Sequence, residues 1–187
     1  MKDDVTWIHE IPFDRSYWVI PGQLLAGFFP GAKDPVQESA NMEGLITAGI
    51  RHVISLMEPD ELDHQGKPFS LYQNRFREMA TSKGINVTWE RIPIRDISVP
   101  SKDGMVMILD RIDQALAQQQ PVYVHCWGGK GRTGTVVGCY LVRHGIAEGE
   151  VALKAIQTMR RNNPKAHEPS PETREQCDFV LRWKADG

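Results

Sequence analysis

The chain has little that would place it among secreted, membrane-spanning or nucleic-acid-binding proteins. Its 187 residues contain three cysteines and carry a formal net charge of -2. An odd and small number of cysteines does not form a disulfide framework, so we expect a reducing, cytoplasmic location. No apolar run reaches the roughly 18 residues of a membrane span, and residues 1–15 lack the apolar core of a signal peptide.

The near-neutral charge also excludes a global electrostatic field that would attract nucleic acid or an anionic membrane, so affinity for an anion must be local. No repeat, low-complexity segment or linker divides the sequence, whose composition is 41% hydrophobic and 25% charged. These values are typical of a globular protein. We therefore predict one domain over residues 1–187, with residues 1–15 as an N-terminal extension.

Hydrophobic patterns predict strands that alternate with helices along the chain. The predicted strands cover 16–25 (with a turn at Pro21–Gly22), 51–57, 85–94 and 121–125. The predicted helices cover 34–48 (or 39–48), 69–83, 103–119, 132–144, 148–161 and 171–184. This alternation predicts an α/β fold, with a mainly parallel central sheet of four to five strands and helices on both faces.

One segment, from His125 to Gly134 (HCWGGKGRTG), carries the strongest chemical signal. It connects a predicted buried strand to a predicted buried helix through a glycine-rich loop. Such a junction binds a phosphate-sized anion through its backbone N–H groups, here those of residues 127–132. Arg132 can hold two phosphate oxygens at once. The loop residues that provide N–H donors are Trp127, Gly128, Gly129, Lys130 and Gly131. We expect the three glycines among them to give the loop its unusual dihedral angles.

Cys126 lies at the base of this loop, where the helix N-terminus and Arg132 favour a thiolate. We therefore expect Cys126 to be a nucleophile. We expect the Thr133 hydroxyl to donate a hydrogen bond to its sulfur, and His125 to orient the loop through backbone hydrogen bonds. Asp96 follows another predicted strand, so it should lie at the same sheet edge, where its carboxyl group can act as a general acid. These donors neutralise a phosphate without a metal or cofactor.

Other polar and sulfur-containing residues have simpler interpretations. The cluster Asp60, Glu61, Asp63 and His64 has the composition of a metal site, but a solvated acidic loop over 58–68 explains it better. Cys139 and Cys177 are expected to be small buried apolar residues. Three tryptophans are expected to serve packing alone: Trp18, Trp89 and Trp183.

The pattern His-Cys-x5-Arg-Thr-Gly at 125–134 resembles the signature of the cysteine-dependent protein-tyrosine and dual-specificity phosphatases. The resemblance implies a dual-specificity-phosphatase-like fold, with Cys126 as nucleophile, Arg132 as phosphate ligand, Thr133 assisting thiolate release and Asp96 as general acid. Asp96 lies about 30 residues before the cysteine, as in the dual-specificity branch, and the stretch Ile94–Asp96 lacks the Trp-Pro-Asp sequence of the tyrosine-specific branch.

Two details of the resemblance concern substrate and water. Residues 129–132 (GKGR) are similar to the loop of phosphoinositide phosphatases, although Trp127 stands where that group carries a second lysine. In related enzymes a glutamine near the last helix positions the hydrolytic water, which indicates Gln176 or Glu172 here.

We therefore predict a phosphomonoesterase that forms a cysteinyl-phosphate and dephosphorylates phosphotyrosine, with or without phosphoserine and phosphothreonine, in proteins. An inositol phosphate or phosphoinositide substrate is the main alternative. A phosphate-binding module without turnover would lack a nucleophile or an acid, and a rhodanese-like sulfurtransferase has no need of Thr133 or an upstream acid. The expected partner is a phosphorylated protein or small phosphoester, not nucleic acid.

Overall fold

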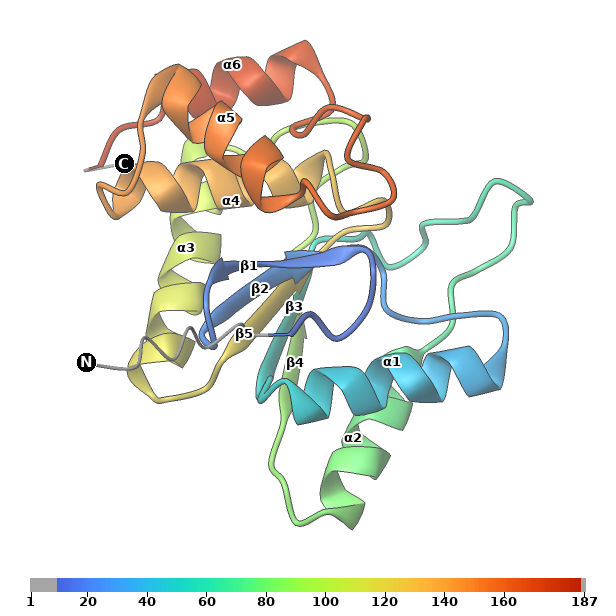
Figure 1. Ribbon diagram of the computed structural model, residues 1–187. Coiled ribbons are helices and arrows are strands. Elements are labelled where there is room, and N and C mark those ends of the chain that lie inside the picture. Colours follow the sequence, from blue (N-terminus) through green and yellow to red (C-terminus); the bar gives the residue numbers. More distant parts are fainter. Residues whose placement is uncertain (1–9, 186–187) are drawn as a thin grey trace.

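The computed structural model describes residues 10–185, which form a three-layer α/β domain (Figure 1). Residues 1–9 of the predicted N-terminal extension lie outside the described residues. The central sheet has the strand order β1-β2-β5-β3-β4. Its strands are β1 (Ser16–Ile20), β2 (Leu24–Gly27), β3 (His52–Ser55), β4 (Thr88–Arg91) and β5 (Val122–His125). Only β1 runs antiparallel to its neighbour, so the predicted mainly parallel sheet is confirmed.

Helices cover both faces of the sheet, as predicted. Helices α1 and α2 lie together on one face, and α3 to α6 gather on the other (Figure 1). Their bounds are α1 (Pro35–Thr47), α2 (Tyr72–Ser82), α3 (Lys102–Ala117), α4 (Arg132–Arg143), α5 (Gly149–Met159) and α6 (Arg174–Arg182). Helix α4 is buried from Arg132 to Val142 because α3, α5 and α6 all pack around it.

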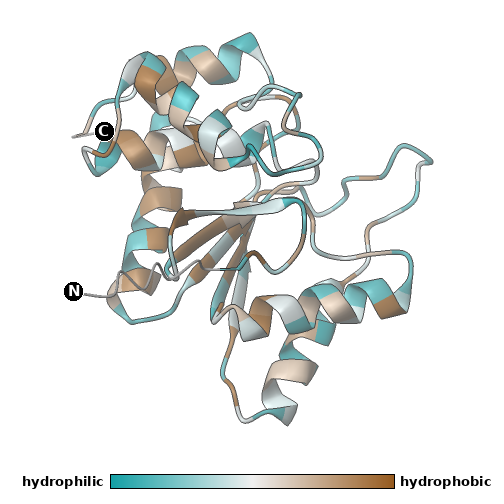
Figure 2. Cartoon of the chain, viewed as in Figure 1, coloured by the Kyte–Doolittle hydropathy of each residue, from teal (hydrophilic) through white to brown (hydrophobic). Residues whose placement is uncertain are grey.

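The alternation of side chains along the strands divides the core into two clusters. In β5, Val122 and Val124 join the cluster beneath α3 to α6, whereas Tyr123 joins the one beneath α1 and α2. Every residue of β3 and β5 is buried, which is typical of central parallel strands, and the middle strands in Figure 2 are correspondingly hydrophobic. The carboxyl ends of β5 and β3 are thereby fixed side by side.

The described part of the N-terminal segment packs on the domain. The Phe13 ring makes edge contacts with Phe28 and Tyr123, at centroid distances of 5.5 and 5.8 Å. The Arg15 guanidinium donates to the Gly128 carbonyl over 2.9 Å and lies 4.3 Å from the centroid of Phe28. Residues 13 to 15 therefore contribute to the surroundings of the glycine-rich loop.

Several element boundaries differ from the sequence predictions. The predicted strand over 85–94 shortens to β4, an edge strand without a fully buried residue. The predicted helix over 171–184 begins later, at Arg174, because the Thr173 side chain accepts the N–H of Gln176 and the Gln176 side chain bonds back to the N-cap backbone. This reciprocal capping box fixes the start of α6.

Candidate active site

The segment 126–131, here called the cysteine loop, connects the end of β5 to the start of α4. The backbone N–H groups of residues 127–132 donate no hydrogen bond to any group in the described part of the chain. Gly131 is the N-cap of α4 and provides no side-chain cap. A run of free donors beside a helix N-terminus is a binding site for an anion.

Of the three loop glycines, only Gly129 adopts a left-handed conformation, with φ of 72°. A Cβ at this position would lie 2.6 Å from the backbone of Gly27 and Phe28, so both conformation and space require glycine. Gly128 and Gly131 do not have a positive φ, but Gly131, with φ of -75° and ψ of -87°, lies outside the helical and extended regions, as expected. At Gly131 a Cβ would lie 3.1 Å from the side chains of Gln176 and Glu172, so close packing is the constraint there.

Cys126 is 2% exposed, at the base of the loop. The Thr133 hydroxyl donates to its sulfur over 3.1 Å and also lies 3.3 Å from the Gly27 carbonyl oxygen. This is the contact that the sequence predicted for Thr133. Cys139 is fully buried in α4, where burial raises the pKa of its thiol, whereas Cys177 is only partly buried.

The guanidinium of Arg132 is buried and held from several sides. Glu61 accepts from Nη1 and Nη2 over 2.7 and 2.8 Å, and Asp96 Oδ1 lies 2.8 Å from Nη2. Nη1 also reaches the Ile94 carbonyl oxygen at 3.2 Å. Burial lowers the pKa of Arg132, but the Glu61 hydrogen bonds and the charges of Cys126, Glu61 and Asp96 together raise it above its ordinary value. The third guanidinium nitrogen, Nε, takes part in none of these bonds.

Glu61 is the residue that the sequence analysis misplaced. We expected residues 58–68 to form a solvated acidic loop, yet the Glu61 side chain is 8% exposed and forms a bidentate ion pair with Arg132. The correction has a physical reason: a buried guanidinium needs a carboxylate to compensate its lost hydration. Nothing in the local sequence separates Glu61 from the neighbouring acids, because its partner is distant along the chain.

His125 is fully buried behind the cysteine loop, where a chain of hydrogen bonds holds its ring in place. Its Nδ1 lies 3.1 Å from the Cys126 carbonyl oxygen, and its Nε2 lies 2.6 Å from the Tyr72 hydroxyl. Tyr72 in turn accepts the indole N–H of Trp89 over 2.8 Å. These bonds are consistent with Nδ1–H donating to the carbonyl and Tyr72 donating to Nε2. Trp89, expected to serve packing alone, therefore also orients the histidine.

We expect the free energy of unfolding to fall as the pH decreases from about 6.5 to about 3, because burial lowers the pKa of His125 from 6.5 to about 3. The unfolded chain takes up a proton in this range and the folded chain does not. Between pH 7 and 4.5 the loss from this residue is of the order of 2–3 kcal/mol, from about 1.36 kcal/mol per pKa unit. Urea unfolding at the two pH values measures it. His125→Asn, which does not titrate, should lose correspondingly less over the same interval; equal losses in both proteins would contradict the assignment.

The segment that carries Asp96 follows β4 and reaches the cysteine loop, as the sequence predicted from the shared sheet edge. The Asp96 carboxylate is half exposed and pairs with Arg132. The next residue, Ile97, is β-branched yet has φ of 53°, a conformation that costs of the order of 1–3 kcal/mol. Gln176 Nε2 donates to the Ser98 carbonyl over 3.0 Å and holds the segment against α6.

Acidic side chains offset the charge of Lys130 at the edge of the site. The Lys130 ammonium lies 2.7 Å from Glu168 Oε2 and 2.9 Å from Glu172 Oε1. Its bond to Glu168, with the further bond to Glu172, raises the pKa of Lys130. Gln176, one of the two candidates for positioning water, is fully buried and bonded within the cap of α6, whereas Glu172 lines the cavity.

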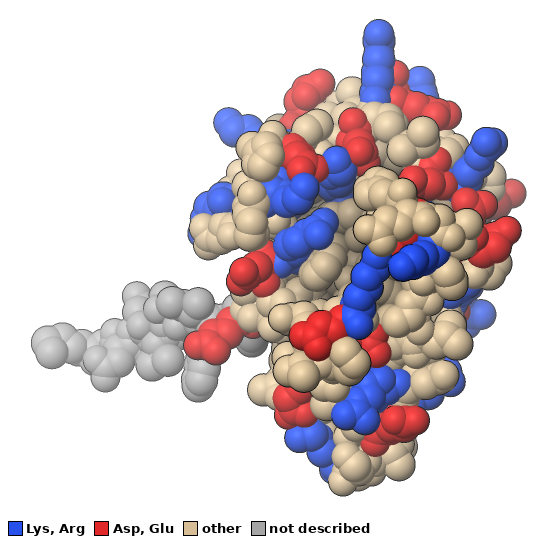
Figure 3. Space-filling view, turned by 90° about the vertical axis from the view of Figure 1, so that its right-hand side faces the viewer, with Lys and Arg blue, Asp and Glu red and all other residues tan. Residues whose placement is uncertain are grey.

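A cavity of about 490 Å³ opens above the cysteine loop. Cys126, Arg132 and Asp96 line it together, with Glu172 and Lys130 at its edge. The space-filling view shows the hollowed face of the molecule, with basic and acidic groups interspersed around the hollow (Figure 3). The structure thus brings the predicted nucleophile, phosphate ligand and acid into one cavity, and adds Glu61 behind the arginine.

The chain is similar in fold and in sequence to known phosphatases. The structure of a kinase associated phosphatase, with its catalytic cysteine substituted by serine, matches with a TM-score of 0.64 and 19% identity over 89% of this chain and 90% of that chain. Two curated relatives come from Arabidopsis thaliana. The phosphatidylglycerophosphate phosphatase PTPMT2 is 30% identical over 73% of this chain and 52% of its own length. The protein named phosphatidylinositol 3,4,5-trisphosphate 3-phosphatase and protein-tyrosine-phosphatase PTEN1 is 28% identical over 80% of this chain and 33% of its own length.

The fold and the site define a cysteine-dependent phosphatase domain. A family model described as the DSP-PTPase phosphatase domain of PTP-SAK, a Swiss Army Knife protein, matches residues 14–180, and the chain belongs to this family. The chain spans about a third to about half of the length of these curated relatives. Across residues 10–185, the structure contains no helix that is both long and apolar enough to cross a membrane.

Proposed function

We propose that the chain hydrolyses phosphomonoesters through a cysteinyl-phosphate intermediate, and that its substrates are proteins carrying phosphotyrosine, with or without phosphoserine and phosphothreonine. The observation that supports this most directly is the position of the Cys126 sulfur beneath a run of unbonded backbone N–H groups, in one cavity with Arg132 and Asp96. A phosphate dianion needs such donors on its non-bridging oxygens and a nucleophile in line with its leaving oxygen.

In the first step the phosphate displaces Asp96 from Arg132, and its oxygens bind Nη2, Nε and the loop N–H groups. The Cys126 thiolate attacks phosphorus, the bond from phosphorus to the ester oxygen breaks, and its electron pair leaves with that oxygen. Asp96, as the carboxylic acid, gives its proton to the leaving oxygen. A product alcohol or phenol and a cysteinyl-phosphate result.

In the second step water attacks the phosphorus of the cysteinyl-phosphate while the Asp96 carboxylate takes a proton from it. The bond from sulfur to phosphorus breaks, and the Thr133 hydroxyl, 3.1 Å from the sulfur, stabilises the departing thiolate. Inorganic phosphate leaves and Cys126 returns to its starting state. We assign the orientation of the water to Glu172, which lines the cavity, whereas Gln176 supports the segment around Ser98.

Inositol phosphates and phosphoinositides form the second candidate class of substrate, supported by the activities for which the relatives PTEN1 and PTPMT2 are named. A substrate with several phosphates needs free cations beyond Arg132. The ammonium of Lys130 is instead engaged by Glu168 and Glu172, and Trp127 replaces the second lysine of the phosphoinositide-specific loop. These two features disfavour a second phosphate group on the Lys130 side of the site.

A panel of substrates tests the proposal. Matched phosphotyrosine, phosphoserine and phosphothreonine peptides are compared with inositol phosphates by phosphate release, with Cys126→Ser as the blank. We expect kcat/KM to be highest for the phosphotyrosine peptide. Turnover of inositol phosphates without turnover of any peptide would establish the second class instead, and no turnover of any ester would leave a phosphate-binding module.

We expect Asp96→Asn to lower kcat by about 100-fold for an alkyl phosphate and by less than about 10-fold for p-nitrophenyl phosphate. The asparagine has no proton to give, and a poor leaving group depends on that proton more than the stable nitrophenolate does. Steady-state kinetics on both esters measure the difference. Asp103→Asn, at an exposed acid in the first turn of α3, is the matched control. Equal losses on the two substrates would argue against Asp96 as the acid.

A further inference from the structure

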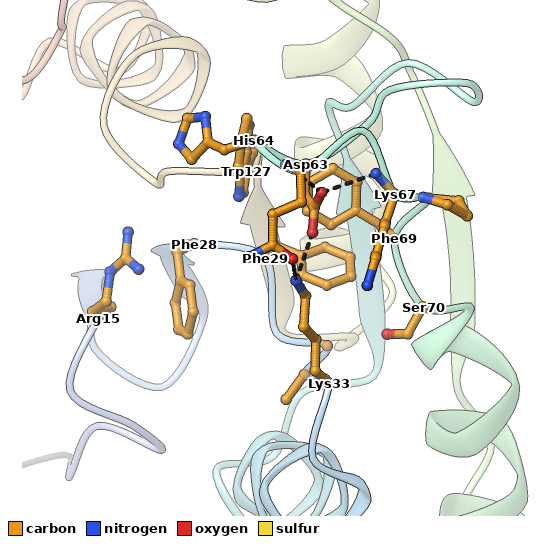
Figure 4. A pocket seen from close by; sticks show the side chains of 14 residues that line it. Arg15, Phe28, Phe29, Lys33, Asp63, His64, Lys67, Phe69, Ser70 and Trp127 are labelled. Carbon is orange, nitrogen blue, oxygen red and sulfur yellow. Dashed lines mark hydrogen bonds and ion pairs between the residues drawn. The ribbon is translucent and has the colours of Figure 1, made fainter.

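A second hollow of about 690 Å³ adjoins the active-site cavity (Figure 4). Its apolar wall consists of Phe28, Phe29, Phe69 and Trp127, and we call it the aromatic groove. Trp127 separates the two hollows and contacts His64 and Phe69 at ring-centroid distances of 4.3 and 5.2 Å. Trp127, His64 and Arg15 line both hollows, so a ligand whose phosphate lies over Cys126 can continue into the groove.

The edge of the aromatic groove carries an excess of positive charge. Among the residues that line the groove, Asp63 alone carries a carboxylate. This carboxylate is paired with Lys33, whose ammonium lies 2.7 Å away (Figure 4). Lys67 is exposed and, within the described residues, its ammonium has no carboxylate within 4 Å. The half-buried guanidinium of Arg15 donates to the Gly128 carbonyl and feels the negative charge of Glu168 only at longer range. Lys67 thus remains unpaired on this side of the active site, and Arg15 has no carboxylate in direct contact.

The opposite edge of the active site has the reverse balance. There Glu168 and Glu172 surround Lys130, and Glu168 also lies 2.8 Å from Lys165. A substrate that extends from the phosphate therefore meets free cations in one direction and occupied ones in the other. This asymmetry selects for negative charge on the groove side.

We propose that the aromatic groove is a second substrate subsite that binds a peptide segment flanking the phosphorylated residue, with an acidic side chain at Lys67 and Arg15 and an apolar side chain against Phe69 and Trp127. The inference rests on the proposed function, whose substrate class it makes specific. A peptide fits better than an anionic membrane surface, because acidic groups interrupt the basic ones around the hollow (Figure 3), whereas membranes attract continuous basic surfaces.

The test uses two phosphotyrosine peptides that differ only in their flank, Glu-Phe in one and Gly-Ser in the other. Calorimetry measures their binding to Cys126→Ser, which separates the groove from turnover, and kinetics measure kcat/KM with the active protein. We expect the Glu-Phe peptide to be favoured by about 10-fold in both measurements, with a smaller preference at high salt. The preference should appear with the flank on one side of the phosphotyrosine and not on the other.

Variants in the groove assign the preference to its residues. We expect Lys67→Glu to lower kcat/KM for the Glu-Phe peptide by about 5-fold and Phe69→Ala by about 10-fold, with p-nitrophenyl phosphate, which is too short to reach the groove, changed less than about 2-fold. Lys154→Glu, at an exposed position on α5, is the matched charge control. If Phe69→Ala unfolds the chain, Lys67→Glu on the exposed edge still decides the question.

The outcomes separate the groove from the proposed function. Equal binding of the two peptides would overturn the subsite, even where p-nitrophenyl phosphate turnover upholds the phosphatase. Absence of turnover with all esters would overturn the function, while the binding arm still reports on the groove. A flank-independent result with peptides, together with a loss of phosphoinositide turnover in Phe69→Ala, would assign the groove to an acyl chain and contradict the proposal.

Discussion

Turnover by Cys126→Ser is expected to fall by at least about 10⁴-fold, while vanadate and tungstate still bind with affinities close to those of the unchanged protein. The serine hydroxyl occupies nearly the same space beneath the loop N–H groups, but it is not ionised and cannot replace a thiolate as the attacking group. The oxyanion ligands of the site, Arg132 and the loop N–H groups, are unaltered. Steady-state kinetics and calorimetry of the oxyanions measure the two parts of this prediction.

The other two cysteines provide the controls for this experiment. Cys177→Ser alters a partly buried thiol on α6, so its activity should stay within about 2-fold of the unchanged protein, as expected for a substitution away from the site. Alkylation with iodoacetate should abolish activity through Cys126, and bound phosphate should slow the modification. Full turnover by Cys126→Ser, or by fully alkylated protein, would remove the mechanism altogether.

The sequence predicted the parts of the site that depend on a short continuous segment. Cys126 and Arg132 belong to one strand-loop-helix junction, so their proximity follows from local geometry and their spacing. Asp96 required one further rule, that the carboxyl ends of parallel strands share an edge. The same rule does not predict the position of Glu61, because a solvated acidic loop and an acidic loop that covers an arginine have the same composition.

For the fold, the sequence predicted the type and order of the elements better than their ends. The alternation of strands and helices is a strong signal over long segments and gave the parallel sheet and its two helical layers. The ends of elements were less well determined, because they depend on contacts that no periodicity records. Helix α6 begins at its Thr173 cap instead of at Pro171, and the hydrogen bonds from Trp89 through Tyr72 to His125 connect residues from β4, α2 and β5.

The second hollow could not be predicted for a related reason. Its wall combines Phe28 and Phe29 after β2 with Phe69 and Trp127 from two later loops. Each aromatic residue alone suggests packing, and only their assembly beside the cysteine loop exposes a common apolar surface. The absence of a directly contacting carboxylate at Arg15 and Lys67 likewise becomes visible only once the ion pair of Lys33 with Asp63 is known.

We expect Arg132→Lys to lower kcat/KM by about 10³-fold and to weaken oxyanion binding as well. The guanidinium donates to Glu61 through two nitrogens and still has Nε, with Nη2 once Asp96 moves away, to hold two phosphate oxygens. A lysine ammonium is a compact group that cannot span the carboxylate and the phosphate in this fixed geometry. Kinetics with p-nitrophenyl phosphate and calorimetry with vanadate measure the two losses.

The same substitution should reduce the free energy of unfolding by about 2–3 kcal/mol, because the buried Glu61 carboxylate loses one of its two charge-assisted bonds. Glu61→Gln separates this structural effect from the chemical one. It keeps the guanidinium that binds phosphate and removes only its anchor, so we expect a loss of about 10-fold in kcat/KM, with vanadate binding largely retained. Activity of Arg132→Lys within 10-fold of the unchanged protein would show that a positive charge is sufficient and that the guanidinium geometry is not needed. A larger loss in Glu61→Gln than in Arg132→Lys would show that the arginine serves the structure more than the reaction.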